Sequence, residues 1–129
     1  ASVHLTGVNI SDGTGIVGGA IAAMGSNLTL DTTGFFGNAA TVYGGAIYAT
    51  SSSVVSFVGH NILSNNLAEV DGGAMFVSDS VCSGENLSLF NNTSGGDGGA
   101  LMITERSNLS WSGEGVFREN RAGGAGGAI

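Results

Sequence analysis

The chain contains no proline and no lysine, and its single cysteine is Cys82. One cysteine excludes an internal disulfide framework. The absence of proline beside 24 glycines excludes a collagen-like chain and argues against a disordered linker. Charged residues make up only 10% of the chain, and three arginines stand against ten acidic residues. Because phosphate binding needs a basic patch, we expect no nucleic acid among the partners of this protein.

Long apolar runs are also absent. No stretch approaches the roughly 18 apolar residues of a membrane-spanning helix, so we expect no membrane insertion by this segment. A hydrophobic content of 42% is nevertheless sufficient for the core of one domain. The chain begins at Ala1 instead of methionine, which we interpret as a mature product or an excised segment.

A tetrapeptide of two glycines, alanine and an apolar residue occurs five times in the sequence. Its first glycines are separated by 26, 28, 26 and 28 residues, which defines an internal repeat. Glycines can adopt a positive φ, so we expect the motif to form a sharp turn in each repeat. The expected turn glycines are Gly18, Gly19, Gly44, Gly45, Gly72, Gly73, Gly98, Gly99, Gly126 and Gly127.

A second fixed position precedes the tetrapeptide by six residues, and it holds an asparagine or its near-isostere aspartate. The residues at this position are Asp12, Asn38, Asn66, Asn92 and Asn120. Three residues further back the last four repeats have an apolar residue. The residues at that position are Asn9, Phe35, Leu63, Leu89 and Phe117.

This pattern predicts an all-β fold, a parallel β-helix (solenoid) with about five coils of 26–28 residues. Equivalent residues of successive coils then stack at the usual strand spacing of about 4.8 Å. An inward asparagine at a corner can hydrogen-bond to the asparagines above and below it, which forms an amide ladder. A β-sandwich or a β-propeller is the alternative, but neither requires one fixed corner per repeat.

Alternation of apolar and polar residues predicts further strands in each coil. We expect one set of strands around Leu28–Leu30, Val55–Phe57, Leu87–Leu89 and Leu109–Trp111. Their apolar residues should point inward. Another set follows the glycine motif, as in the segments 47–50 and 75–77. Cys82 is expected to be a small packed residue in the loop 80–84.

The two motifs together resemble the repeats of the polymorphic outer-membrane protein family, the chlamydial autotransporter adhesins. Phe35–Asn38 and Phe117–Asn120 match the FxxN motif, and the five glycine motifs match GGA followed by Ile, Leu or Val, with Met75 as a variant. The resemblance extends over essentially the whole chain and implies a right-handed β-helix displayed at a cell surface, often adhesive. The first coil departs from it, with Asn9 and Asp12 in place of Phe and Asn.

Four asparagines are candidate N-glycosylation sites because they stand in Asn-x-Ser/Thr sequons and are expected to point outward. They are Asn27, Asn86, Asn108 and Asn91. Asn92 also stands in a sequon, but as a member of the inward ladder it should remain unmodified. N-linked glycans are therefore expected if the protein is secreted by a eukaryote, and no other cofactor is expected.

Calcium binding and catalysis are weaker alternatives. Asp71 and Asp97 precede the glycine motif in adjacent coils and form a weak calcium candidate, although solvated corner acids are the simpler interpretation. The remaining acidic residues are dispersed along the chain, whereas polysaccharide cleavage needs carboxylates clustered on one face. We expect no catalytic residues and no resident metal. No Thr-x-Thr column repeats through the coils, which argues against ice binding.

The sequence thus predicts that residues 1–129 form a single β-helix module, either a segment of a longer array or a subunit that stacks end to end. Unpaired strand edges at the two ends of a β-helix favour head-to-tail association into a filament. The expected function is that of a non-enzymatic module of an extracellular surface fibre or adhesin. A bacterial autotransporter-type passenger fragment that binds a host receptor or glycans is the alternative, and a polysaccharide-binding or polysaccharide-cleaving β-helix is a third possibility.

Overall fold

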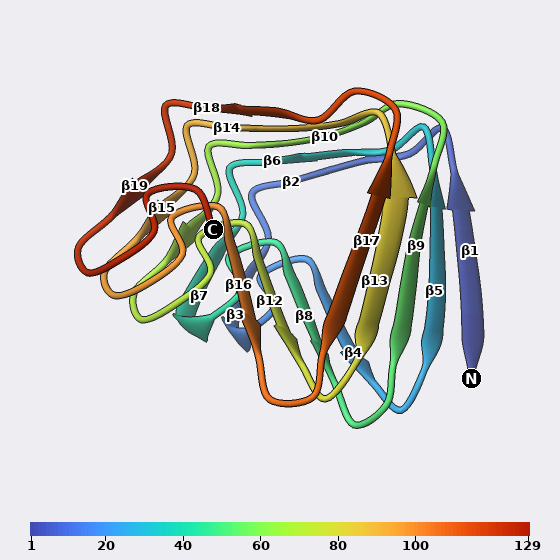
Figure 1. Cartoon of the computed structure of the whole chain (residues 1–129), viewed down its shortest axis with the longest axis horizontal. Coiled ribbons are helices and arrows are strands. Elements are labelled where there is room, and N and C mark those ends of the chain that lie inside the picture. Colours follow the sequence, from blue (N-terminus) through green and yellow to red (C-terminus); the bar gives the residue numbers. More distant parts are fainter.

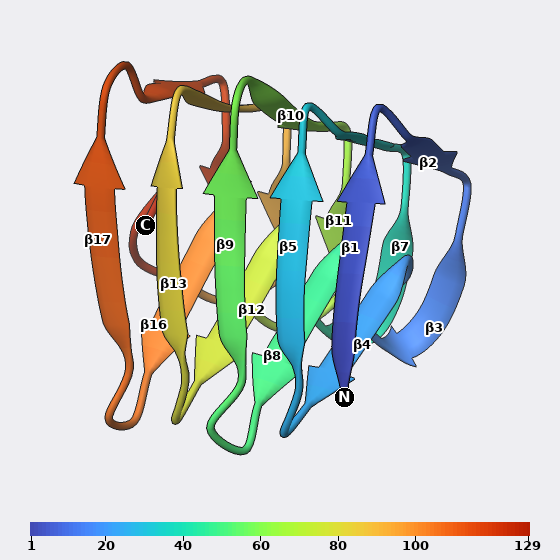
Figure 2. The ribbon, with the colours of Figure 1, turned by 90° about the vertical axis from the view of Figure 1, so that its right-hand side faces the viewer.

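The chain forms a solenoid in which short strands from successive coils pair in parallel. The computed structural model describes residues 1–129 and contains nineteen strands and no helix. Figure 1 looks along the solenoid, so that equivalent strands of successive coils lie behind one another, and Figure 2 shows the coils from the side. In both views the chain winds as a right-handed helix from its N-terminus to its C-terminus.

Four parallel sheets, named A to D in chain order, make up the walls of the solenoid. Sheet A contains β1 (Ser2–Thr6), β5 (Asn27–Asp31), β9 (Val54–Val58), β13 (Val81–Glu85) and β17 (Asn108–Ser112). Sheet B contains β2 (Asn9–Ser11), β6 (Gly34–Phe36), β10 (Asn61–Ser64), β14 (Leu87–Phe90) and β18 (Val116–Arg118). Sheet C contains β3 (Thr14–Val17), β7 (Ala39–Tyr43), β11 (Leu67–Ala68), β15 (Thr93–Ser94) and β19 (Arg121–Ala122). Sheet D contains β4 (Ile21–Met24), β8 (Ile47–Thr50), β12 (Met75–Ser78) and β16 (Leu101–Thr104).

Each complete coil therefore contributes one strand to every sheet. Four coils are complete, and the fifth has strands in sheets A, B and C only. The predicted parallel β-helix of about five coils is confirmed with this small difference. No helix is present that could cross a membrane.

The interior of the solenoid is filled by one column of apolar side chains from each inward strand position. Eighteen buried residues form a single cluster, to which sheets A, B and D and the alanines of the glycine motif contribute. Phe35, Leu63 and Leu89 stack in sheet B, for example, and each is at most 1% exposed. Burying a side chain of this size stabilises the fold by roughly 1.5–3 kcal/mol, so the core is the main source of stability.

The fourth coil corrects one prediction. The segment Leu87–Leu89 was expected in the same wall as Leu28–Leu30, but it lies in sheet B opposite Asn61–Leu63. Sheet A is occupied in this coil by β13 instead, where Cys82 stacks between Val55 and Leu109. Cys82 is therefore a buried strand residue and not a loop residue. The alternation in β13 was not recognised because its inward residues are the small Cys82 and Gly84.

The corners between the sheets require left-handed backbone conformations. A residue with positive φ occurs at each corner, and aligned residues fall into columns. The corner between sheets B and C, for example, holds Asp12, Gly37, Asn65, Asn91 and Glu119, with φ between 55° and 65°. Asparagine, aspartate and glycine tolerate this conformation best, which explains their abundance in the chain.

The glycine motif forms the corner between sheets C and D, and its two glycines have different tasks. The first glycine has positive φ in every coil, as at Gly44 with φ 65°. The second does not: a Cβ atom on Gly45 would meet the carbonyl oxygen of Gly73 and lie 2.6 Å from that of Leu67. The expectation that the motif makes a sharp turn is met by its first glycine, whereas the second allows the backbones of adjacent coils to approach closely.

Candidate functional site

A ladder of asparagine side chains follows the corner between sheets B and C. The backbone N–H and the Nδ2 of Asn38 both donate to Oδ1 of Asn66, at 3.0 and 3.1 Å. Asn66 donates in the same way to Asn92, and Asn92 to Asn120, at 3.0 Å. The second Nδ2 hydrogen of each asparagine goes to a main-chain carbonyl of the preceding coil, as from Asn66 to Phe35.

These amides are buried and almost completely hydrogen-bonded. Asn38, Asn66 and Asn92 are at most 1% exposed. Burying an amide is unfavourable unless its donors and acceptors are paired, and here every ladder group within the stack has a partner. The ladder thus ties each corner to the next one and fixes the register of the coils.

Asp12 was predicted to belong to this column, and that prediction is wrong. Thr14 pairs with Ala39, which places Gly13 opposite Asn38, and the N–H of Gly13 donates to Oδ1 of Asn38 at 2.9 Å. Asp12 instead occupies the positive-φ column of the corner, with φ 58°.

A difference in register explains both departures of the first coil from the repeat pattern, at Asp12 and at Asn9. Ile10, and not Asn9, lies opposite Phe35 in the apolar column. The cause is a register shift between Gly15 and Val17, where the first coil is one residue shorter than the second. Counting back a fixed six residues from the glycine motif therefore gave the wrong residues in this coil alone.

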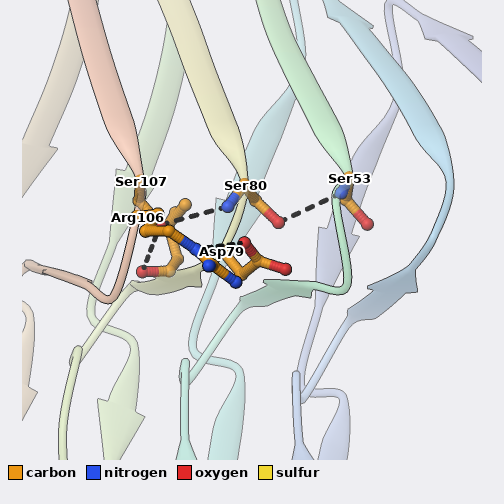
Figure 3. Close-up of polar contacts among 6 residues, drawn as sticks. Ser53, Asp79, Ser80, Arg106 and Ser107 are labelled. Carbon is orange, nitrogen blue, oxygen red and sulfur yellow. Dashed lines mark hydrogen bonds and ion pairs between the residues drawn. The ribbon is translucent and has the colours of Figure 1, made fainter.

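A second ladder, of serines, runs along the corner between sheets D and A and was missed in the sequence. The N–H groups of Ser26, Ser53 and Ser80 donate to the Oγ atoms of Ser53, Ser80 and Ser107, each at 3.1 Å. Figure 3 shows the part of this ladder from Ser53 to Ser107. The only signal for it was the spacing of 27 residues between members, and serine is too frequent here for that spacing to be noticed.

Beside the serine ladder, Arg106 approaches Asp79 (Figure 3). The distance from Nε to Oδ1 is 3.6 Å, and the side chains are 89% and 40% exposed. Solvent-exposed pairs of this kind contribute little to stability.

The sequon asparagines occupy different environments. Asn27 and Asn108 are exposed at the first positions of β5 and β17, where the register places them in one outward column with Val54 and Val81 between them. Asn91 is exposed at a positive-φ corner.

Asn86 does not open a strand of sheet A as Asn27 and Asn108 do, although it was grouped with them in the prediction. It lies at the positive-φ corner between sheets A and B, is half-buried, and accepts a hydrogen bond from the N–H of Glu114 at 3.0 Å. Asn92 is fully buried in the asparagine ladder.

Asp71 and Asp97 stack in adjacent coils, and each caps the backbone of the following coil. Oδ1 of Asp71 accepts the N–H of Asp97, and Oδ1 of Asp97 accepts the N–H of Ala125, both at 2.7 Å. Both carboxylates thus have a structural task at the glycine-motif corner. No group of three or more His, Cys, Asp or Glu side chains is arranged to hold a metal ion.

Groups that could support catalysis are also scattered. Burial raises the pKa of the Cys82 thiol to about 12, so this cysteine is not a nucleophile in the folded protein. Nε2 of His60 lies 3.3 Å from Oγ of Ser88. The largest depression, about 320 Å³, is an open hollow on the outer face of sheet A with Ser56, Ser83 and Glu85 in its lining. One carboxylate among hydroxyl groups offers no acid–base pair.

Comparison with known families identifies the repeat. The model of the Chlamydia polymorphic membrane protein repeat matches residues 35–50 and 86–104. The first match begins at Phe35 in sheet B and the second at Asn86, at the corner before sheet B, and both extend through the ladder asparagine and the glycine motif into sheet D. No curated protein sequence and no solved structure matches the chain. The resemblance inferred from the two motifs is confirmed over these segments: residues 35–50 and 86–104 match the Chlamydia polymorphic membrane protein repeat and lie in two coils of the parallel β-solenoid.

Proposed function

We propose that this solenoid is a non-enzymatic structural module of a surface fibre or adhesin. The observation that carries the proposal is the match to a membrane-protein repeat at two coils, together with a fold whose repeated residues all serve the stacking of coils. The match also supports a location at the cell surface in general terms. The core, the two ladders and the glycine corners are used for shape, which leaves the outer faces free to vary.

Adhesion to a host receptor or glycan is the finer part of this proposal. The outer faces carry half-buried aromatic residues in two places: Phe36 and Phe90 on sheet B, and Tyr43 and Tyr48 beside sheet D, whose rings stack on the buried Phe76. Aromatic side chains contribute strongly to recognition surfaces.

The test of adhesion is binding of chain-coated beads to cultured host cells, compared with beads coated with heat-unfolded chain. Binding that depends on the folded chain supports an adhesin. Equal binding by both kinds of bead, or none, leaves a purely structural role.

Stacking of modules end to end is the second part of the proposal. The coils at both ends of the solenoid expose strand edges and incompletely covered inward residues. Leu5 and Ile10 are in this position at one end, and Leu109 and Trp111 at the other. A parallel strand edge with an apolar lining is completed by another coil. Negative-stain imaging of concentrated chain tests this part, since rods longer than one module would support association and uniform short particles would contradict it.

Glycosylation is proposed at Asn27, Asn108 and Asn91, if the protein passes through a secretory pathway that attaches N-linked glycans. All three are exposed, and none of their side-chain amides hydrogen-bonds within the chain. Glycans at Asn27 and Asn108 would shield Val54 and Val81, which are 37% and 39% exposed in the same column. Asn86 is a poorer acceptor because its amide oxygen already binds the backbone of Glu114. Intact mass of natively sourced protein before and after glycan removal, followed by peptide mapping, tests the sites and their order.

A further inference from the structure

Both side-chain ladders have the same direction along the solenoid. In each column the backbone N–H of one coil donates to a side-chain oxygen of the following coil, as from Asn38 to Asn66 and from Ser53 to Ser80. A coil can therefore satisfy its ladder donors only if the coil after it presents a side-chain oxygen at both positions. This requirement is a rule for which coil can follow which.

The first coil does not meet this requirement. Its residue in the asparagine column is Gly13, and the pairing of Ser2 with Asn27 places Ala1 in the serine column opposite Ser26. Neither residue has a side-chain oxygen. A Cβ atom on Gly13 would meet the carbonyl oxygen of Gly19 and lie 2.9 Å from Oδ1 of Asn38, so the shortened coil has no room for asparagine there. The first coil can donate to a ladder but cannot accept from one.

The fifth coil is the opposite case. Oδ1 of Asn120 accepts from Asn92, and one Nδ2 hydrogen of Asn120 goes to the carbonyl of Leu89 at 2.9 Å. By analogy with the coils before it, the N–H and second Nδ2 hydrogen of Asn120 and the N–H of Ser107 are directed toward a following coil. Three donors of this coil are thus available to one neighbour.

We propose that the edge formed by β17, β18 and β19 selects its partner by these donors. The partner is a β-solenoid coil of the same repeat type, with an amide or carboxylate oxygen in the asparagine column and a hydroxyl group in the serine column. The first coil of a second copy is a poor partner, because Gly13 and Ala1 would leave the donors of Asn120 and Ser107 unpaired at the joint. The inference rests on the proposed function that coil edges pair, and it names which coil pairs well.

The rule can be tested in the full chain by adding one coil. A copy of residues 102–129 is appended after Ile129, since Leu101 and Ile129 are one repeat apart. A matched variant carries the same extra coil with its copies of Asn120 and Ser107 changed to alanine. Amide hydrogen exchange of the original Asn120 and Ser107 then reports the pairing. We expect the unmodified coil to slow exchange at both residues by about tenfold or more relative to the alanine coil, the factor that roughly one net hydrogen bond provides.

The possible outcomes separate the inference from the proposed function. Equal slowing by both extra coils overturns the selection rule but leaves edge pairing intact. No slowing by either coil overturns the pairing of coil edges and the rule with it.

Discussion

Replacing Asn66 with alanine should strongly destabilise the solenoid, because Asn66 lies in the middle of the asparagine ladder. The change removes four hydrogen bonds: two that Oδ1 accepts from Asn38, one that Nδ2 donates to Phe35 and one that it donates to Asn92. The N–H of Asn66 itself keeps its bond to Asn92. All of the partners are buried, so water cannot readily replace the lost amide.

The size of the effect follows from the groups that lose a partner. The N–H of Asn38 and the carbonyl of Phe35 are the main ones, and leaving a buried polar group unpaired costs about 1–3 kcal/mol. Together with the small cavity, we expect a loss of about 3–5 kcal/mol in the free energy of unfolding, a large part of the 5–15 kcal/mol typical of a domain. The matched control is Asn27→Ala, an exposed site that should change stability by no more than about 0.5 kcal/mol.

Urea unfolding measures both variants, with the midpoint and slope compared so that loss of cooperativity is detected. Solenoids can unfold coil by coil, so hydrogen exchange of the Asn38 amide provides a local measurement that does not assume a two-state transition. A loss below about 1 kcal/mol for Asn66→Ala, or one equal to that of Asn27→Ala, would refute the conclusion that the ladder stabilises the coils.

Three further predictions concern other parts of the solenoid. Gly45→Ala should lower the free energy of unfolding by more than about 3 kcal/mol or prevent folding, because the new Cβ atom meets backbone carbonyl groups. Gly25→Ala is the control: its Cβ atom would lie 3.5 Å from the nearest atom, so it should cost only the roughly 1–2 kcal/mol of a left-handed alanine. Urea midpoints compare the two variants, and similar losses of stability would contradict the reasoning. Burial raises the pKa of the Cys82 thiol to about 12, so Cys82 should not react with a thiol reagent at pH 8 until urea unfolds the chain. Rapid reaction in the native protein would contradict this expectation and show that β13 opens. Arg106→Ala should change the free energy of unfolding by no more than about 0.5 kcal/mol, and a loss above 1 kcal/mol would mean that its pair with Asp79 is stronger than its exposure implies.

The repeat made most of the fold predictable, since a fixed spacing of glycine and asparagine dictates which residues stack. Phe35, Asn38 and Gly44 were assigned correctly because the four later coils all repeat these positions at the same distance from the glycine motif. The first coil was misassigned because a one-residue deletion changes that distance, and the sequence alone does not show on which side of the column the deletion lies.

The other errors have related causes. Sheet A of the fourth coil was missed because Cys82 and Gly84 are too small to produce a visible apolar alternation, and Leu87–Leu89 imitates the missing strand. The serine ladder was missed because a hydroxyl group that bonds to backbone has no characteristic neighbours in the sequence. Asn86 was grouped with Asn27 and Asn108 because its sequon resembles theirs, whereas the structure places it at a positive-φ corner.

The central claim is that this solenoid is a structural module displayed at a cell surface. Immunogold labelling of intact source cells, with an antibody raised against the folded chain, tests it most directly. The account predicts label on the outside of unpermeabilised cells, and label that appears only after permeabilisation would contradict it.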